Sequence, residues 1–236
     1  MHIGLVGGVG VAATVVYYQR LTAAVAAMDG PPLDLTISHG DIQTLIRNVQ
    51  AGAKRPQAEL FAAQVARLKT AGADVAAVTS LGGHFCFDEL AAISPLPLVS
   101  AVTPVDSALA ARGIRRVGLL GTRVVMDSRL YGQLKATVAV VLDDEIEELG
   151  QTYQDIAVAG HCTTGQRSAL VDAGQRMIDE LGADAVLLAG TDLNLAFDDA
   201  DPGYTVIDAL DVHVDVLARL ATGRLTLDAV AVGGGL

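Results

Sequence analysis

Hydrophobic residues in this chain fall in short continuous runs, and segments with helical periodicity separate these runs. A strand with one face in water alternates apolar and polar residues, whereas a run such as 185–189 is apolar throughout. Continuous runs are typical of parallel strands that helices cover on both sides. The predicted strands are 3–6, 33–38, 75–79, 96–99, 116–120, 138–142, 185–189 and 204–207. The predicted helices are 12–28, 42–51, 57–71, 85–93, 104–112, 126–135, 145–159, 165–181 and 209–222.

The alternation of strands and helices predicts an α/β fold with doubly wound parallel sheets. The chain also repeats itself, because Gly72-Ala73-Asp74 before one strand recurs as Gly182-Ala183-Asp184 before another, 110 residues later. Between 72–88 and 182–198, five of 17 positions are identical. The repeat predicts two pseudo-symmetric halves. The alternative is that strand–glycine turns look alike in any α/β protein.

We expect the first half to comprise residues 1–102 and 208–222 and the second to comprise 103–207, with 223–236 as a flexible tail. A protein of two such halves tends to bind its ligand in the cleft between them, beyond the carboxyl ends of the strands. The sequence therefore predicts an inter-domain cleft with a small-molecule ligand.

Composition narrows the classes of function. The 236 residues carry 16 Lys and Arg against 27 Asp and Glu, a net charge of −11, which argues against a nucleic-acid partner. Although 51% of the residues are apolar, no uncharged apolar run reaches the ~18 residues of a membrane span. The N-terminus resembles a strand that enters a turn, not a signal peptide. We therefore expect a cytoplasmic protein without a membrane partner.

The first turn is a candidate anion site. Gly8, Gly10 and Ala13 follow the first predicted strand with the spacing G-x-G-x-x-A, and the next helix begins there. Bare backbone amides at a helix N-terminus suit an anion, and Thr14 lies in the first helical turn. A dinucleotide site would need an acidic residue at the end of the second strand, but that strand ends at Ser38 and His39. A small carboxylate site and a plain tight turn remain as alternatives.

Two further loops carry polar residues at strand ends. In the first, Thr79 and Ser80 precede Gly82, Gly83 and His84. These hydroxyls and backbone amides can hold a carboxylate, and the imidazole can move a proton. The alternative is that Ser80 is only a helix cap.

The pseudo-equivalent loop of the second half runs from Gly190 through Thr191 and Asp192. Asp192 is a candidate general base and Thr191 a candidate ligand donor, unless one of them is merely an N-cap. The five histidines are scattered without metal-ligand spacing, so the sequence predicts no metal site.

Several segments, taken in order, resemble the aspartate/glutamate racemase family. The opening 3–18 resembles the family's strand, Gly-Gly turn and Tyr-Tyr. His84 and its preceding loop resemble the family's Cys-Asn-Thr-Ala-His loop, and 188–192 resembles its Gly-Cys-Thr-Glu loop. Segment 121–131, with Gly121-Thr122 and Tyr131, and segment 207–213, with Asp208 and His213, are similar to two further family motifs.

The resemblance implies an isomerase of amino acid metabolism that inverts Cα without a cofactor, using two thiols on opposite faces of the substrate. This chain departs from that pattern, because Ser80 and Gly190 occupy the two cysteine positions. Cys86 and Cys162 are the only cysteines, and neither stands at a required place. An arginine that often follows the second strand is also missing, because that segment is His39-Gly40-Asp41.

We therefore predict a racemase or isomerase with non-cysteine acid/base groups: Asp192, His84 and Ser80. The predicted substrate-binding residues are Gly8, Gly10, Thr14, Thr79, Gly82, Gly83, Thr122, Gly190, Thr191 and His213. The expected substrate is a small amino acid or carboxylate, and the resemblance implies a homodimer. Two alternatives stay open: a decarboxylase or other isomerase on the same scaffold, and a non-catalytic binder of small carboxylates.

Overall fold

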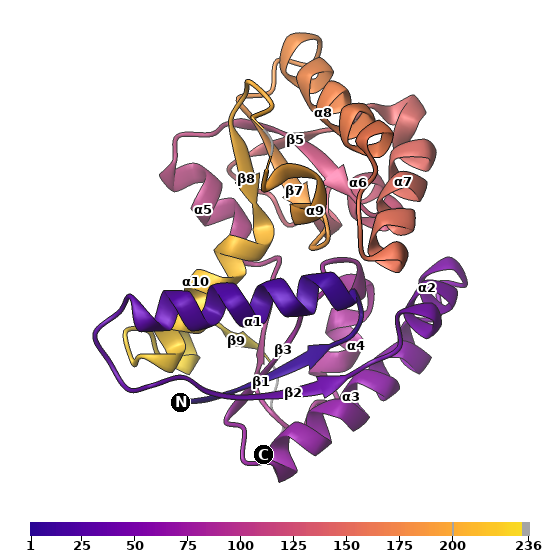
Figure 1. The fold of residues 1–236 in the computed structure, drawn as a ribbon. Helices are drawn as coiled ribbons and strands as arrows, with labels where there is room; N and C mark the ends of the chain where they lie inside the picture. Colours follow the sequence, from indigo (N-terminus) through magenta and orange to yellow (C-terminus); the bar gives the residue numbers. More distant parts are fainter. Residues whose placement is uncertain (200, 233–236) are drawn as a thin grey trace. The chain divides into compact units, whose positions relative to one another are not determined.

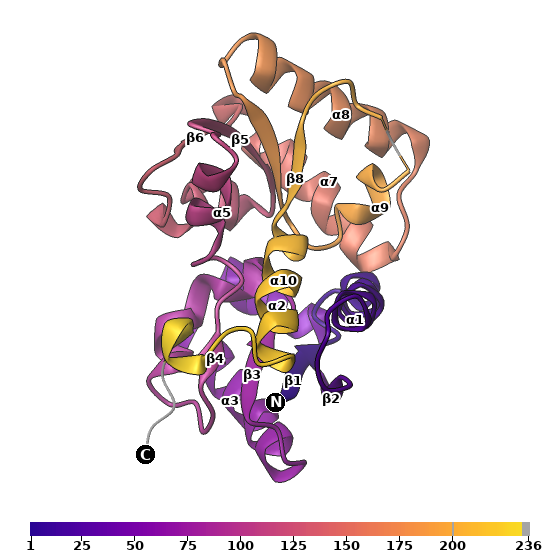
Figure 2. The same cartoon turned by 90° about the vertical axis from the view of Figure 1, so that its left-hand side faces the viewer.

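The computed structural model describes residues 1–199 and 201–232 (Figures 1 and 2). The chain divides into two compact units. Unit 1 contains Met1–Ala101 and His213–Leu236, and unit 2 contains Val102–Val212, so that the division falls within helix α10 (Ala209–Ala221). Each unit is a sheet of parallel strands, with one short antiparallel strand added in unit 1, and flanking helices, which confirms the predicted α/β class. The cleft between halves stays a prediction.

Unit 1 is built around the strand order β2-β1-β3-β4-β9. The first four strands are parallel, and β9 pairs antiparallel with β4. Helix α3 packs across β1, β2 and β3. The elements are β1 (His2–Gly7), α1 (Val11–Ala26), β2 (Asp34–His39), α2 (Ile42–Gln50), α3 (Lys54–Thr70), β3 (Val75–Val78), η1 (Gly82–Cys86), α4 (Phe87–Ala91), β4 (Leu98–Val99), η4 (Leu227–Ala229) and β9 (Ala231–Val232).

Unit 2 repeats this arrangement with the parallel strand order β6-β5-β7-β8. In each unit the first strand along the chain lies between the second and the third, so the two sheets share one topology. The elements are α5 (Val105–Ala111), β5 (Arg116–Gly121), α6 (Arg123–Asp127), η2 (Leu130–Gly132), β6 (Val138–Val140), η3 (Asp143–Glu145), α7 (Ile146–Ala159), α8 (Thr164–Asp179), β7 (Ala185–Ala189), α9 (Asn194–Phe197) and β8 (Val206–Asp208).

The repeated Gly-Ala-Asp segment has the same structural role in both units. Asp74 accepts a hydrogen bond from the His2 backbone N–H at 2.8 Å, at the start of β1. Asp184 accepts from the N–H groups of Arg115 and Arg116, at 2.8 and 2.9 Å, at the start of β5. Each aspartate therefore joins the beginning of the third strand of its unit to the beginning of the first, as a duplicated unit would require.

The core lies on the central strands, as the continuous apolar runs predicted. Every residue of β3 and of β7 is buried, and Leu5 and Leu119 on the neighbouring first strands are buried completely. Each such leucine stabilises its unit by ~1.5–3 kcal/mol relative to an exposed one. None of the helices within 1–199 and 201–232 is long and apolar enough to cross a membrane.

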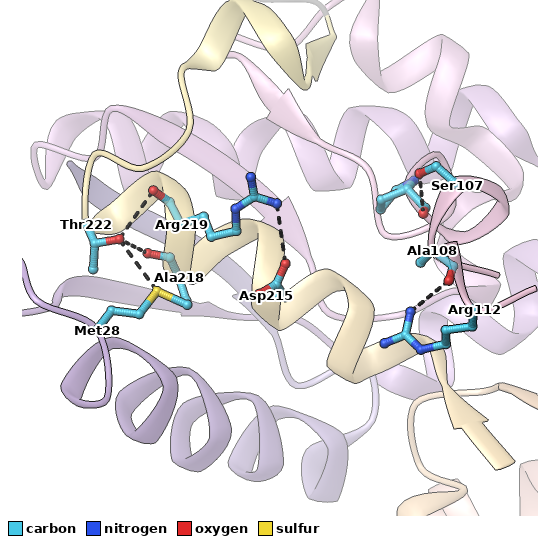
Figure 3. A network of polar contacts seen from close by, with 9 residues as sticks. Met28, Ser107, Ala108, Arg112, Asp215, Ala218, Arg219 and Thr222 are labelled. Atoms are coloured by element: carbon cyan, nitrogen blue, oxygen red, sulfur yellow. Dashed lines mark hydrogen bonds and ion pairs between the residues drawn. The ribbon is translucent and has the colours of Figure 1, made fainter. Parts of the chain in front are cut away.

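The C-terminal segment joins unit 1 through the end of α10. Thr222 donates to the Ala218 carbonyl at 2.8 Å, and its hydroxyl lies 3.7 Å from the Met28 sulfur (Figure 3). One turn earlier, Arg219 forms an i, i+4 ion pair with Asp215 at 3.7 Å (Figure 3). The region expected as a loose tail then contains η4 and β9, while residues 233–236 lie outside the described residues.

The predicted helix 126–135 is wrong. Helix α6 begins earlier, at Arg123, because the Thr122 hydroxyl caps it by accepting from the Val125 N–H at 3.3 Å. The chain then leaves the helical region, since Arg129, Leu130 and Tyr131 have φ values of 48°, 57° and 58°. Left-handed backbone at non-glycine residues costs ~1–2 kcal/mol each, so hydrophobic periodicity alone does not indicate it.

Candidate active site

The glycine turn after β1 is closed by Thr14. Its hydroxyl oxygen accepts from the Gly8 N–H at 2.8 Å and donates to the Gly10 carbonyl at 2.9 Å. Gly8 has a φ of 79°, and a Cβ there would lie 2.4 Å from Nδ1 of His39. The Gly8 amide expected to bind an anion therefore already has a protein acceptor, and this turn fits Thr14 and His39 closely.

Thr79 lies next to this turn at the carboxyl end of β3. Its hydroxyl donates to the Val6 carbonyl at 3.1 Å, and its oxygen lies 3.4 Å from that of Thr14. The structure thus brings together two of the predicted binding residues, Thr14 and Thr79.

The next loop holds His84 through the backbone. Nε2 of the ring accepts from the Ala101 N–H at 3.0 Å, so the ring proton is on Nδ1, which donates to the Ser80 carbonyl at 2.7 Å. The ring stacks on Phe87 at 5.0 Å, and burial lowers the pKa of His84 to about 4. Both ring nitrogens are therefore engaged in a neutral, buried imidazole, which does not suit the proton transfer expected of it.

Ser80 keeps a polar group at the start of this loop. Its Oγ accepts from the Gly83 N–H at 3.2 Å, inside the 3₁₀ turn η1, whose N-cap residue is Leu81. As acceptor in that bond, the hydroxyl can still donate its own proton. Gly82 and Gly83 are buried, and a Cβ on Gly83 would lie 3.3 Å from the Phe61 ring.

His213, a predicted binding residue, lies in the core of unit 1. Its Nδ1 is 2.8 Å from the Tyr17 hydroxyl, and the two rings meet edge to face. Burial first, and the neighbouring His84 second, lower the pKa of His213 to about 3. Because the side chain has no exposed surface, its place in the structure is that of a neutral core histidine. Asp208, at the end of β8, accepts from the Leu210 N–H at 2.8 Å, as a cap for α10 does.

Neither cysteine has the properties of a catalytic thiol. Burial raises the pKa of Cys86 to about 12, and its sulfur contacts the Gly83 carbonyl at 3.5 Å. Burial also raises the pKa of Cys162, which lies in the loop between α7 and α8. A protonated thiol is a poor nucleophile and base.

In unit 2, Asp192 lies just beyond the carboxyl end of β7, at 1% exposure. The hydroxyl of Tyr153, from α7, donates to its Oδ2 at 3.2 Å. Thr191 is equally buried, and its side chain also interacts with Tyr153. Gly190 precedes them, and a Cβ there would lie 2.3 Å from Cε2 of Tyr153. The loop thus contains a buried carboxylate with a phenol donor.

Sequence reasoning missed Tyr153 and Asn194. Tyr153 shares the buried face of α7 with Leu149 and Ile156, so its spacing is that of any core residue. Asn194 follows the loop at 6% exposure, and its Oδ1 is buried with no hydrogen-bond partner in the described chain. A buried acceptor of this kind calls for an explanation, and a donor on a ligand supplies one.

A separate cavity of about 300 Å³ lies beside the carboxyl end of β2. His39, Asp41, Gln64 and Arg67 are among the residues that line it, together with Phe61. None of the predicted site residues lines this cavity. Within 1–199 and 201–232, no group of three or more His, Cys, Asp or Glu side chains could hold a metal ion.

Two α/β units whose sheets share one topology, each with polar loops at its strand ends, place this protein in the class of duplicated α/β proteins. A family model described as Asp/Glu/Hydantoin racemase matches residues 6–217, and the chain belongs to that family. Membership places it among racemase-type isomerases and agrees with the resemblance seen in the sequence.

Solved structures of racemases share the fold, and three of them serve as examples. One is a proposed Asp/Glu racemase from Yersinia pestis, with 24% identity, a TM-score of 0.78 and coverage of 94% of this chain and 99% of that one. An aspartate racemase homologue from Pyrococcus horikoshii has 25% identity, a TM-score of 0.75 and coverage of 93% and 98%. Aspartate racemase from Picrophilus torridus has 21% identity, a TM-score of 0.74 and coverage of 97% of each chain.

Proposed function

We propose that this protein catalyses cofactor-independent proton transfer at Cα of a small amino acid or carboxylate, with Asp192 as the group that moves the proton. One observation carries the proposal: a carboxylate is buried at the carboxyl end of β7, and a phenol donates to it. Burying a charged group is unfavourable unless it is paired, and such groups are concentrated at functional sites. Membership of a racemase family supports the type of reaction.

Asn194 supports an amino acid as the substrate. Its unpartnered Oδ1 is two residues from Asp192 along the chain and is buried. An ammonium group offers three donors and would satisfy this acceptor. A substrate without an amino group would leave the Asn194 oxygen desolvated and unpaired, which costs ~1–3 kcal/mol.

In unit 1 we propose that Ser80 contributes a hydroxyl donor and that His84 positions the loop. Removing a Cα proton on one face and delivering one on the other needs two acid/base groups. His84 and His213 are both buried with lowered pKa values, both ring nitrogens of His84 and Nδ1 of His213 have hydrogen-bond partners, and the pKa of Cys86 is about 12. The lack of a second free acid/base group among these side chains favours a second candidate, a one-base reaction such as decarboxylation. In that reaction CO2 leaves, the carbanion at Cα takes a proton from Asp192 in its neutral carboxylic acid form, and solvent then reprotonates Asp192.

The test is a screen of D- and L-amino acids and small dicarboxylates in D2O, followed by proton NMR. Loss of the Cα signal with inversion supports racemisation, whereas release of CO2 with single deuteration of the product supports the one-base reaction. Asp192→Asn should abolish either signal. Asp172→Asn, at an exposed position on α8, is the matched control and should retain it. Full turnover by Asp192→Asn would refute the assignment, and binding without exchange would point to a non-catalytic carboxylate binder.

A further inference from the structure

The ring of Tyr153 lies directly against the bare Cα of Gly190. A Cβ at position 190 would lie 2.3 Å from Cε2, 2.8 Å from Cδ2 and 2.9 Å from Cζ of that ring. Non-bonded carbon atoms normally stay about 3.5–4.0 Å apart, so no side chain fits at 190 while the ring keeps its place. Position 190 must therefore be glycine as long as the Tyr153 ring keeps its place. This steric limit also accounts for the absence of a cysteine at position 190.

Two features hold the ring in this position. Tyr153 lies in the middle of α7 at 5% exposure, on the face that carries Leu149 and Ile156. Its hydroxyl donates to Oδ2 of Asp192 at 3.2 Å. Burial first, and the Asp192 charge second, raise the pKa of Tyr153 well above its usual value. The phenol consequently keeps its proton and remains a donor to the carboxylate.

We propose that Tyr153 is a positioning residue for Asp192, seated on Gly190 so that its hydroxyl orients the carboxylate and favours its ionised form. The inference rests on the proposed function, since it assigns a role in the proton transfer there given to Asp192. An oriented, ionised carboxylate is the form that accepts a proton from Cα. A hydrogen bond to that form makes it persist to lower pH.

A second tyrosine in the same unit provides a matched control. A Cβ at Gly174 would lie 2.0 Å from the Tyr204 hydroxyl oxygen, so this tyrosine also packs on a glycine. Its hydroxyl donates to the Val171 carbonyl at 3.0 Å, a backbone acceptor. Tyr204→Phe thus removes the same atom from a tyrosine that also packs on a glycine, here through the hydroxyl itself, and the hydrogen bond that is lost goes to a backbone carbonyl and not to a carboxylate.

The kinetic test compares Tyr153→Phe with Tyr204→Phe on the substrate identified by the exchange screen. Tyr153→Phe should lower kcat ~10–100-fold with KM within ~2-fold, as the loss of an outer-shell partner does. The acid limb of its pH–rate profile should move to higher pH, because the carboxylate loses a donor. Gly190→Ala should produce the same movement by displacing the ring. Tyr204→Phe should leave kcat and the profile unchanged.

A stability test judges the pair without any substrate. Melting temperatures are measured for the wild type, Tyr153→Phe, Asp192→Asn and the double variant. If the hydroxyl and the carboxylate interact, the double variant should lose less than the sum of the two single losses.

The outcomes separate the two proposals. Exchange by the wild type that persists in Tyr153→Phe with an unchanged pH profile overturns the role of Tyr153 and leaves the proposed function standing. A wild type that exchanges no substrate overturns the proposed function and with it the catalytic role of Tyr153. Additive melting losses overturn the Tyr153–Asp192 pair itself, whereas non-additive losses support it.

Discussion

Lowering the pH from 7 to 5 should destabilise unit 1 through two buried histidines. The pKa of His84 is about 4 and that of His213 about 3 in the folded protein, against about 6.5 in an unfolded chain. Both folded values are depressed, so the stability they confer is complete above pH 6.5 and is lost as the pH falls toward 4. In that interval the unfolded chain binds protons that the folded rings do not.

The magnitude follows from linkage between protonation and folding. Between pH 7 and pH 5 each histidine should lower the free energy of unfolding by roughly 2 kcal/mol, so the pair should lower it by roughly 4 kcal/mol. That is a large part of the ~5–15 kcal/mol typical of a folded domain. Carboxylates with lowered pKa values, such as Asp106 and Glu145, contribute their losses mainly below about pH 5.

Urea unfolding at pH 7, 6 and 5, followed by far-ultraviolet circular dichroism, measures this effect, since the chain has no tryptophan. His84→Gln and His213→Gln should each remove about half of the pH dependence. His161→Gln, at an exposed position, should preserve it. A fall in the free energy of unfolding of less than ~1 kcal/mol between pH 7 and pH 5 would refute the reasoning. It would also be refuted if the His84→Gln variant showed the same fall as the wild type.

Three further predictions concern local structure, each read as a urea midpoint or melting temperature. Asp184→Ala removes the acceptor of two backbone N–H groups and should destabilise the protein more than Asp74→Ala, which removes the acceptor of one. The reverse order would contradict the equivalent roles of the two aspartates at the strand starts. Gly8→Ala should destabilise through its φ of 79° and through contacts with His39 and the Gly40 carbonyl oxygen, and adding His39→Ala should restore only the part due to the His39 ring; complete recovery would show that backbone strain and the Gly40 contact are both negligible. Thr163→Ala should cost ~1 kcal/mol, because it breaks the capping box of α8, and an unchanged midpoint would show that the box adds nothing.

The sheet pattern could be predicted because it depends on residue type along the chain. Runs such as 185–189 are apolar throughout, and burial on both faces of a parallel sheet demands that composition. The left-handed turn at Arg129–Tyr131 could not be predicted in this way. Its residues have the periodicity of a helix, but the backbone leaves the helical conformation there. In this turn the Ser128 hydroxyl accepts a hydrogen bond from the Tyr131 N–H at 2.9 Å.

The site could be predicted only in part, for a similar reason. Asp192 is conspicuous because it is an acid directly after an apolar strand. The tautomer of His84 depends on the Ala101 N–H, which lies 17 residues further along the chain, and no local sequence pattern predicts that donor. Tyr153 acts through a contact between α7 and the Gly190 loop, while its spacing in the helix is that of ordinary core residues.

Unit 2 is one continuous segment of the chain, whereas unit 1 consists of two segments, and this difference sets the order in which the units can fold during synthesis. All of unit 2 lies between Val102 and Val212, so its sheet can close as soon as that stretch has emerged. Unit 1 begins first but needs His213 beside Tyr17 and β9 beside β4, and both His213 and β9 follow unit 2 in the sequence. A nascent chain therefore holds an unfinished N-terminal sheet, with the β4 edge unpaired, until the residues that follow unit 2 have also emerged.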